Sequence, residues 1–131
     1  MSGEFFRRRG IGVAYDPILA DLIRLALGER PGIVEKHMFG GIAFMLNGNM
    51  CAGIVKDQLM LRSAPEQYDA LLEREGVQPM EFTGRPMRGF VFVDASATTT
   101  VAAVRRWLKP SLAYVDSLPA KPPTRKPARK K

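Results

Sequence analysis

The residues that could do chemistry in this 131-residue chain are few, because it has one histidine, His37, and one cysteine, Cys51. A catalytic nucleophile needs a base within hydrogen-bond reach, and a metal site needs several ligands together. His37 has no nucleophile or ligand cluster beside it in the sequence. Cys51 lies in a predicted strand, without a helix N-terminus or a local cation to lower its pKa. We therefore interpret His37 as a structural or surface residue and Cys51 as a small core residue. We predict a protein without enzymatic activity, metal or cofactor.

The glycine pair Gly40-Gly41 is the next candidate for a ligand-binding loop. Neither of the spacings that bind phosphate groups through glycine, GxGxxG and GxxxxGK[ST], occurs in the chain. Adjacent glycines between two strands most simply permit a bulge or a close approach of two backbones. We interpret the pair as structural.

Two arginines, Arg85 and Arg88, lie in the glycine- and proline-rich segment 83–89, just before a predicted strand. Such a pair could present donors to a carboxylate or a phosphate group. The same side chains could instead form ion pairs with Glu81 or Asp94. We favour the structural interpretation.

Two further groups of side chains each have two interpretations. Arg105-Arg106 beside Trp107 could form a basic-aromatic patch, or a solvated helix face with an anchored indole. Clustered methionines can form an adaptable binding surface, but they also fill gaps in ordinary cores, which is the safer interpretation. The methionines concerned are Met38, Met45, Met50 and Met60.

The net charge of +7 is unevenly distributed along the sequence. Residues 119–131 contribute +6 and residues 1–13 contribute +2, which leaves the segment between them at −1. We divide the chain into a basic N-terminal arm (1–14), one folded body (15–118) and a basic tail (119–131). A near-neutral body gives little support to a nucleic-acid groove on the folded surface.

The tail, PAKPPTRKPARKK, is rich in proline and lysine and has no large apolar residue, which predicts disorder. Clustered cations bind polyanions because each phosphate contact releases a counterion. We predict weak, non-specific contact with DNA or RNA, with a solubilising role as the alternative. The contact would be made by Lys121, Arg125, Lys126, Arg129, Lys130 and Lys131.

Targeting signals are not evident at the N-terminus. The arginines at positions 7–9 are not followed by the apolar stretch that export requires, because Gly10, Gly12 and Asp16 interrupt it. No segment reaches the roughly 18 apolar residues of a membrane span. Together with the free Cys51, these features predict a cytoplasmic protein without a membrane partner.

The first predicted element is a helix that starts at Pro17, with Asp16 as its N-cap and Gly28 as its end. Ile18, Leu22 and Leu25 fall at i, i+4 and i+7 and predict its buried face. Leu19, Ile23 and Ala26 widen this apolar stripe.

An antiparallel meander is predicted next. Its strands cover residues 34–39, 42–46, 50–55 and 58–62, and Asn47-Gly48 is a strong type I′ hairpin signal. A second helix would follow, with Ser63 and Glu66 as a capping box and Gly76 as its stop.

The remaining elements are a short pairing at 80–82, a strand at 89–93 with both faces apolar, and a last helix from Asp94 or Ser96. We expect Pro110 to kink or divide that helix, with a further short helix after it. The order of elements predicts an α+β fold, with an antiparallel sheet built on the central meander and helices packed mainly on one face.

The central segments also resemble a known family. Met38, Phe39, Gly40, Gly41 and Phe44, with Lys36 before them, resemble the most characteristic motif of the TfoX (Sxy) N-terminal domain family. Asn47-Gly48 and the segments 51–54, 58–62, 80–82 and 87–90 also follow in the expected order. The resemblance covers about residues 15–118, and its motif residues read as determinants of the fold.

The resemblance implies an α+β domain without known catalytic residues. The proteins that give the family its name promote natural competence in bacteria as positive regulators of transcription, acting with the cyclic-AMP receptor protein. Those regulators have a second, helical C-terminal domain, so this chain resembles a stand-alone member. We expect a non-enzymatic regulator that acts through a transcription-related protein partner. The alternative is an interaction or self-associating module with no role in nucleic-acid binding.

Overall fold

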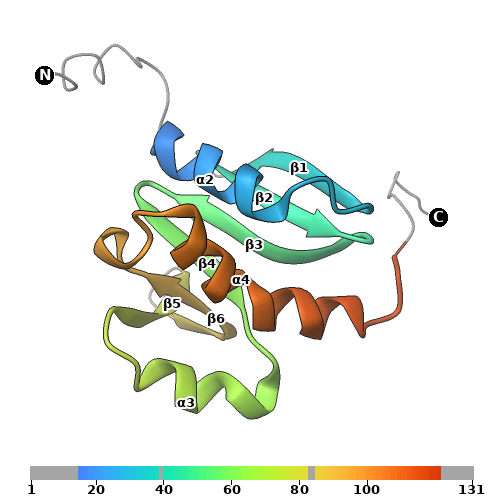
Figure 1. The fold of residues 1–131 in the computed structure, drawn as a ribbon. Helices are drawn as coiled ribbons and strands as arrows, with labels where there is room; N and C mark the ends of the chain where they lie inside the picture. The colour runs from blue at the N-terminus through green and yellow to red at the C-terminus, as the bar shows by residue number, and fades with distance from the viewer. Residues whose placement is uncertain (1–14, 39, 83–84, 122–131) are drawn as a thin grey trace, which may run out of the picture.

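The computed structural model describes residues 15–38, 40–82 and 85–121 (Figure 1). Six strands in this part of the chain form one antiparallel sheet in the order β1-β2-β3-β4-β6-β5. Three helices pack against it, so the predicted α+β class is confirmed. The elements are α2 (Pro17–Leu27), β1 (Ile33–Met38), β2 (Gly41–Leu46), β3 (Asn49–Val55), β4 (Gln58–Arg62), α3 (Tyr68–Leu72), β5 (Val77–Phe82), β6 (Arg85–Val93) and α4 (Val101–Asp116).

The predicted meander forms β1 to β4, with tight turns between its last three strands. Asn47 and Gly48 both have positive φ, at 53° and 84°, which is the backbone of the predicted type I′ hairpin. Lys56 also has positive φ, at 57°, in the turn between β3 and β4. These turns are local features, and the sequence predicted both positions correctly.

The core lies between the sheet and two helices. Phe44, Ala52, Leu61 and Val91 pair across four neighbouring strands and therefore share one face of the sheet. This face packs against α2 and α4, which run in front of the sheet in Figure 1. The helical residues in this core are Leu19, Ile23 and Leu27 from α2, with Val104 and Leu108 from α4.

Helix α2 has the predicted ends but a different buried face. The Asp16 carboxylate accepts a hydrogen bond from the backbone N–H of Ile18 at 2.9 Å, and Pro17 starts the helix. The prediction that Ile18 and Leu25 are buried was wrong, since their exposed fractions are 65% and 62%. Because the apolar stripe of α2 is so wide, the helix could bury either of two faces. Packing against α4 buries the face that carries Leu19, Ile23 and Leu27.

The capping box predicted for Ser63 and Glu66 does not form in the segment after β4. The Ser63 hydroxyl donates to the Ala64 carbonyl at 2.8 Å, and no side chain caps the 3₁₀ turn Pro65–Gln67. Helix α3 then ends at Leu72, four residues before Gly76. The buried Ser63 hydroxyl thus donates to a neighbouring carbonyl and does not accept from a helix N–H as a cap would.

The end of the sheet is more extensive than the sequence indicated. The brief pairing expected at 80–82 is part of β5, which pairs with β6 over most of its length. Strand β6 lies between β4 and β5, an inner position that agrees with the two apolar faces of residues 89–93. The proline of β5, Pro79, is tolerated because β5 is an edge strand.

Helix α4 is a single helix from Val101 to Asp116. Of the expectation that Pro110 kinks or divides the last helix, the division and the separate short helix after it were therefore wrong. A proline inside a helix removes one N–H and crowds the carbonyl four residues earlier, here that of Arg106. Pro110 and Arg106 are both exposed, so water can satisfy that carbonyl. After the proline, Ser111 and Val115 are buried against the sheet, and this packing stabilises the second half of the helix.

Candidate functional site

The family motif lies at the turn from β1 to β2. Gly40 has a φ of 75°, a conformation that favours glycine. A Cβ atom at Gly41 would overlap the carbonyl oxygen of Ile54 on β3, so the backbones of β2 and β3 meet there without a side chain. Phe44 is 1% exposed in the core, while Met38 is half-buried at the end of β1 and Phe39 lies outside the described residues. This geometry positions strands and offers no reactive group.

The basic tail begins on the folded body. The backbone N–H of Lys121 donates to the Asn47 carbonyl at 2.8 Å, and the Asn49 side chain donates to the Pro119 carbonyl at 3.0 Å. Residues 119–121, assigned to the tail from the sequence, therefore pack on the β2–β3 turn. The remaining tail cations lie outside the described residues: Arg125, Lys126, Arg129, Lys130 and Lys131.

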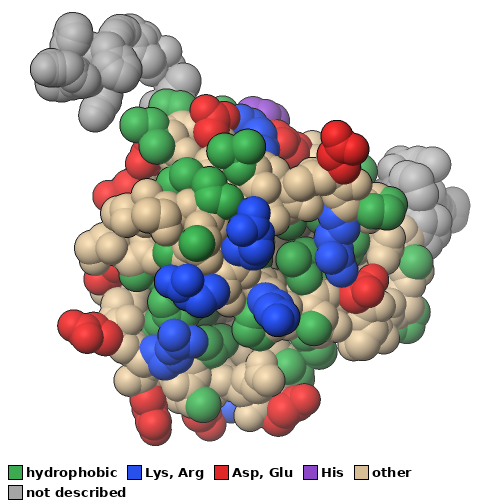
Figure 2. Space-filling model, in the orientation of Figure 1, with side chains coloured by type: hydrophobic (Ala, Val, Ile, Leu, Met, Phe, Trp, Pro, Cys, Tyr) green, Lys and Arg blue, Asp and Glu red, His purple; other side chains and the backbone are tan. Residues whose placement is uncertain are grey.

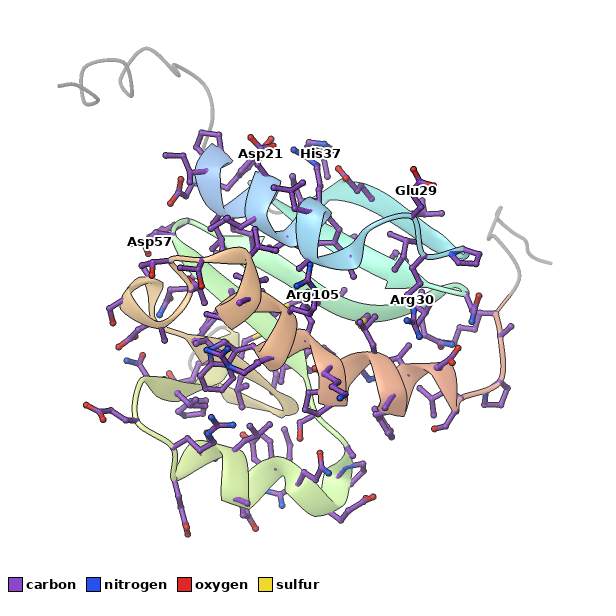
Figure 3. The ribbon with its side chains drawn as sticks, viewed as in Figure 1. Asp21, Glu29, Arg30, His37, Asp57 and Arg105 are labelled. Atoms are coloured by element: carbon purple, nitrogen blue, oxygen red, sulfur yellow. The ribbon has the colours of Figure 1, made fainter. Side chains whose placement is uncertain are left out.

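The two reactive side chains occupy different environments. His37 is exposed on β1, and its ring centroid lies 6.1 Å from that of Tyr15 (Figure 3). Cys51 is 1% exposed and packs with Leu46 and Val115. Burial raises the pKa of its thiol to about 12, although Arg30 and Arg62 have a smaller opposing effect. The thiol is therefore neutral at physiological pH and is a poor nucleophile.

Arg85 and Arg88 both lie within β6 and not before it, and Arg88 forms contacts on the protein surface. Its guanidinium lies 3.6 Å from the Asp69 carboxylate and 4.7 Å from the centre of the Tyr68 ring. The ion-pair partner is thus on α3 and is neither of the acids predicted. The side chain of Arg85 lies outside the described residues.

Trp107 anchors α4 beside α3. Its indole N–H donates to the Ala97 carbonyl at 3.1 Å, and the Arg74 guanidinium stacks on its ring at 4.4 Å. Leu71, Trp107 and Ser111 line a shallow hollow together with Arg62, Arg74 and Arg106. This hollow has room for about one ordered water molecule, which is far too little for a cofactor.

Cations gather on the outer side of α4. Figure 2 shows Lys and Arg side chains in the centre of this face, with Asp and Glu mainly around its rim. Arg105, Arg106 and Lys109 are exposed on α4, and Arg74, from the segment after α3, lines the hollow beside Trp107 together with Arg106. We call these four residues the α4 basic face. The Arg105-Arg106 pair was evident from the sequence. Lys109 was not connected with it, although its i+4 spacing from Arg105 puts it on the same side of the helix.

The four methionines of the meander share the opposite face of the sheet. Met45 pairs with Met50 and with Val34, and Met60 pairs with Gly53. Met60 is buried, whereas Met38, Met45 and Met50 are half-buried, and Val34 is 56% exposed. We call this group the methionine face. Helices α2 and α4 do not pack on it, because they cover the face of Phe44 and Leu61.

Neither a metal-ion cluster nor a membrane-spanning helix is present in the part of the chain that the structure describes. No group of three or more His, Cys, Asp or Glu side chains is placed to hold a metal ion among residues 15–38, 40–82 and 85–121. No helix in these ranges is long and apolar enough to cross a membrane.

A family model described as the TfoX N-terminal domain matches residues 26–114 of the 131-residue chain. The matched region runs from the end of α2 to Tyr114 of α4 and includes the whole sheet. No curated protein matches the chain.

Proposed function

Since this chain belongs to the TfoX N-terminal domain family, we propose that it is a non-enzymatic, cytoplasmic regulator that acts in transcription through a protein partner. The observation that carries the proposal is the match of the family model to the sheet and most of α4. Regulators that give the family its name act in competence, which is the process to test first.

The geometry of the reactive residues supports a binding role over a catalytic one. A catalytic site brings a nucleophile, a base and a pocket together. In the described residues the thiol of Cys51 is buried in the core, His37 is exposed on β1, and the hollow beside Trp107 contains neither.

The tail adds an electrostatic contribution to this function. Lys121 leaves the folded body beside the β2–β3 turn, and the ten residues after it carry five cations and no acid. Such a segment would bind DNA or RNA weakly and would lose the contact as salt rises.

A second candidate function is self-association, which the methionine face favours. Half-buried methionines are adaptable contact residues, and the exposed Val34 extends the apolar surface onto the edge strand β1. Sedimentation at rising protein concentration would test it with Met45→Lys. Leu25→Lys, on the outer side of α2, is the matched control, and circular dichroism would verify folding of both variants. A chain that stays monomeric throughout excludes this candidate.

The main proposal is tested by capture of partners with the full chain as bait. We expect transcription components, including a receptor protein for cyclic AMP, to be retained after nuclease treatment. The second measurement compares duplex DNA binding of the full chain with that of a chain ending at Lys121, across a salt series. Truncation there keeps both hydrogen bonds of this segment, from the Lys121 N–H to the Asn47 carbonyl and from the Asn49 side chain to the Pro119 carbonyl. Capture without any transcription component, together with no DNA binding at low salt, would contradict the proposal.

A further inference from the structure

The α4 basic face is a second place where the protein could meet a polyanion, apart from its tail. We propose that Arg74, Arg105, Arg106 and Lys109 bind the phosphate backbone of a nucleic acid. This goes beyond the proposed function, in which nucleic-acid contact belongs to the tail. It also differs from the expectation that a near-neutral body carries no such surface.

The cations of this face are available for a ligand. None of the four forms an ion pair with an acid in the described residues, where the ion pairs involve Arg24, Arg30 and Arg88. The acid on α4, Asp116, is at the last residue of the helix and lies 3.6 Å from Arg30. The first three turns of α4 therefore present positive charge without a compensating carboxylate on the same helix.

The helix fixes the spacing of the α4 cations, and an aromatic contact orients Arg74. Arg105 and Lys109 are about 6 Å apart along the helix axis, one turn from each other. Arg105 lies where α4 runs beside α2 (Figure 3). The stack on Trp107 orients the Arg74 guanidinium while its N–H groups at the rim can still donate. The indole is fixed in turn by its bond to Ala97. Because the helix backbone is already ordered, binding through these cations does not cost the backbone entropy that ordering the tail would cost.

The chemistry of this face favours phosphates over an acidic protein. Protein interfaces depend on a core of exposed aromatic or large apolar side chains, with charges at the rim. The large apolar residues that are exposed in the described chain, Ile18, Leu25, Val34 and Met87, all lie on other elements. The exposed residues that flank the cations on α4 are Ala102, Pro110 and Ala113, none of them a large aromatic or aliphatic side chain. Contacts to a nucleic-acid backbone are made by polar and charged groups alone and need no such core.

The experiment uses the full chain and a 20-base-pair DNA duplex. The test variant is Arg105→Gln with Lys109→Gln, because glutamine removes the charge and keeps helix propensity at exposed positions. The control is Lys36→Gln with Lys56→Gln, which removes the same charge from exposed cations on β1 and the β3–β4 turn. Both variants are also made in the chain that ends at Lys121, and circular dichroism checks their folding.

We expect the test variant to lower the slope of log K against log salt by about 1.8, from about 0.9 for each phosphate contact. The same relation predicts an affinity loss of up to about 60-fold at 0.1 M salt. The control variant should have a slope close to that of the wild-type chain. An equal loss in the two variants would show that only net charge matters and would overturn the inference. An unchanged test variant would overturn it as well.

Two further arms separate the sources of binding. If the chain ending at Lys121 keeps no affinity for the duplex, while the test variant of the full chain binds normally, the tail proposal stands and the α4 basic face is refuted. If the shortened chain binds and the test variant of it does not, the inference stands without the tail. Polyglutamate is the probe for the other class of ligand. The wild-type chain could bind polyglutamate as tightly as the duplex, with the test variant losing both affinities. That result would assign the α4 basic face to acidic proteins and refute the nucleic-acid proposal.

Discussion

The buried thiol of Cys51 makes stability depend on pH in a way that can be measured. Its pKa is raised from 9.0 to about 12 in the folded protein, mainly because burial disfavours the thiolate. A folded pKa above the unfolded value means that the unfolded chain loses the proton first. The contribution of this group is therefore fully present below pH 9 and is lost as the pH rises from about 9 through 12.

The size of the effect follows from the two pKa values. At pH 10 about ten in eleven thiols are ionised in the unfolded chain, but only about one in a hundred in the folded protein. This difference lowers the free energy of unfolding by about 1.4 kcal/mol between pH 7 and pH 10. Tyrosines and lysines titrate in the same range, so the wild-type curve alone does not isolate the thiol.

The assay is urea denaturation at several pH values for the wild type and for Cys51→Ala. The variant loses stability at all pH values because it leaves a small cavity, but that loss does not depend on pH. We expect the difference between the two proteins to shrink by about 1.4 kcal/mol from pH 7 to pH 10. A difference that stays constant across this range would refute the assignment of Cys51 to a dry core position. Rapid reaction of the native thiol with an aromatic disulfide reagent at pH 8 would refute it independently.

Three further substitutions test the contacts that fix the sheet and α4, each by urea denaturation followed by circular dichroism. Gly41→Ala should cost about 2 kcal/mol or more, because the new Cβ meets the carbonyl of Ile54 and the strands must separate. Trp107→Phe should cost about 1–2 kcal/mol, since the Ala97 carbonyl loses its indole donor. Ser111→Ala should cost about 1 kcal/mol, because the buried hydroxyl donates to a backbone carbonyl of β4 at 2.7 Å.

Matched controls keep these expectations specific. Ala113→Ser changes an exposed position on α4 and should alter the free energy of unfolding by less than about 0.5 kcal/mol. It is the control for the larger loss expected from Ser111→Ala. Gly41→Ala with wild-type stability would mean that β2 and β3 are not in close contact there. A Trp107→Phe variant as stable as wild type would mean that the indole bond contributes nothing.

Much of the sheet was predictable because its turns are specified locally. Asn47-Gly48 can adopt the positive φ values of a type I′ turn at little cost, and this sets where β2 ends and β3 begins. Asp16 and Pro17 likewise define the start of α2 from adjacent residues. The family motif was found in the sequence for a related reason, since Gly40 and Gly41 meet conditions that few other residues can.

The helix faces were not predictable to the same degree. Helix α2 is apolar over so much of its circumference that two buried faces were compatible with its sequence, and contact with α4 decided between them. The course of α4 through Pro110 depends on the sheet, which buries Ser111 and Val115 on the far side of the proline. The partner of Arg88 also came from a distant helix.

Composition and local pattern determined the α+β class, the hairpins and the basic tail, because these depend on residues close in sequence. The tertiary structure alone decided where charge and apolar surface gather. Residues 14–118 sum to −1, yet Arg105, Arg106 and Lys109 are exposed on α4 and Arg74 meets Arg106 at the hollow beside Trp107. Acids lie mainly around the rim of this face (Figure 2). A sum along the chain carries no information on direction, whereas binding depends on which side chains point the same way.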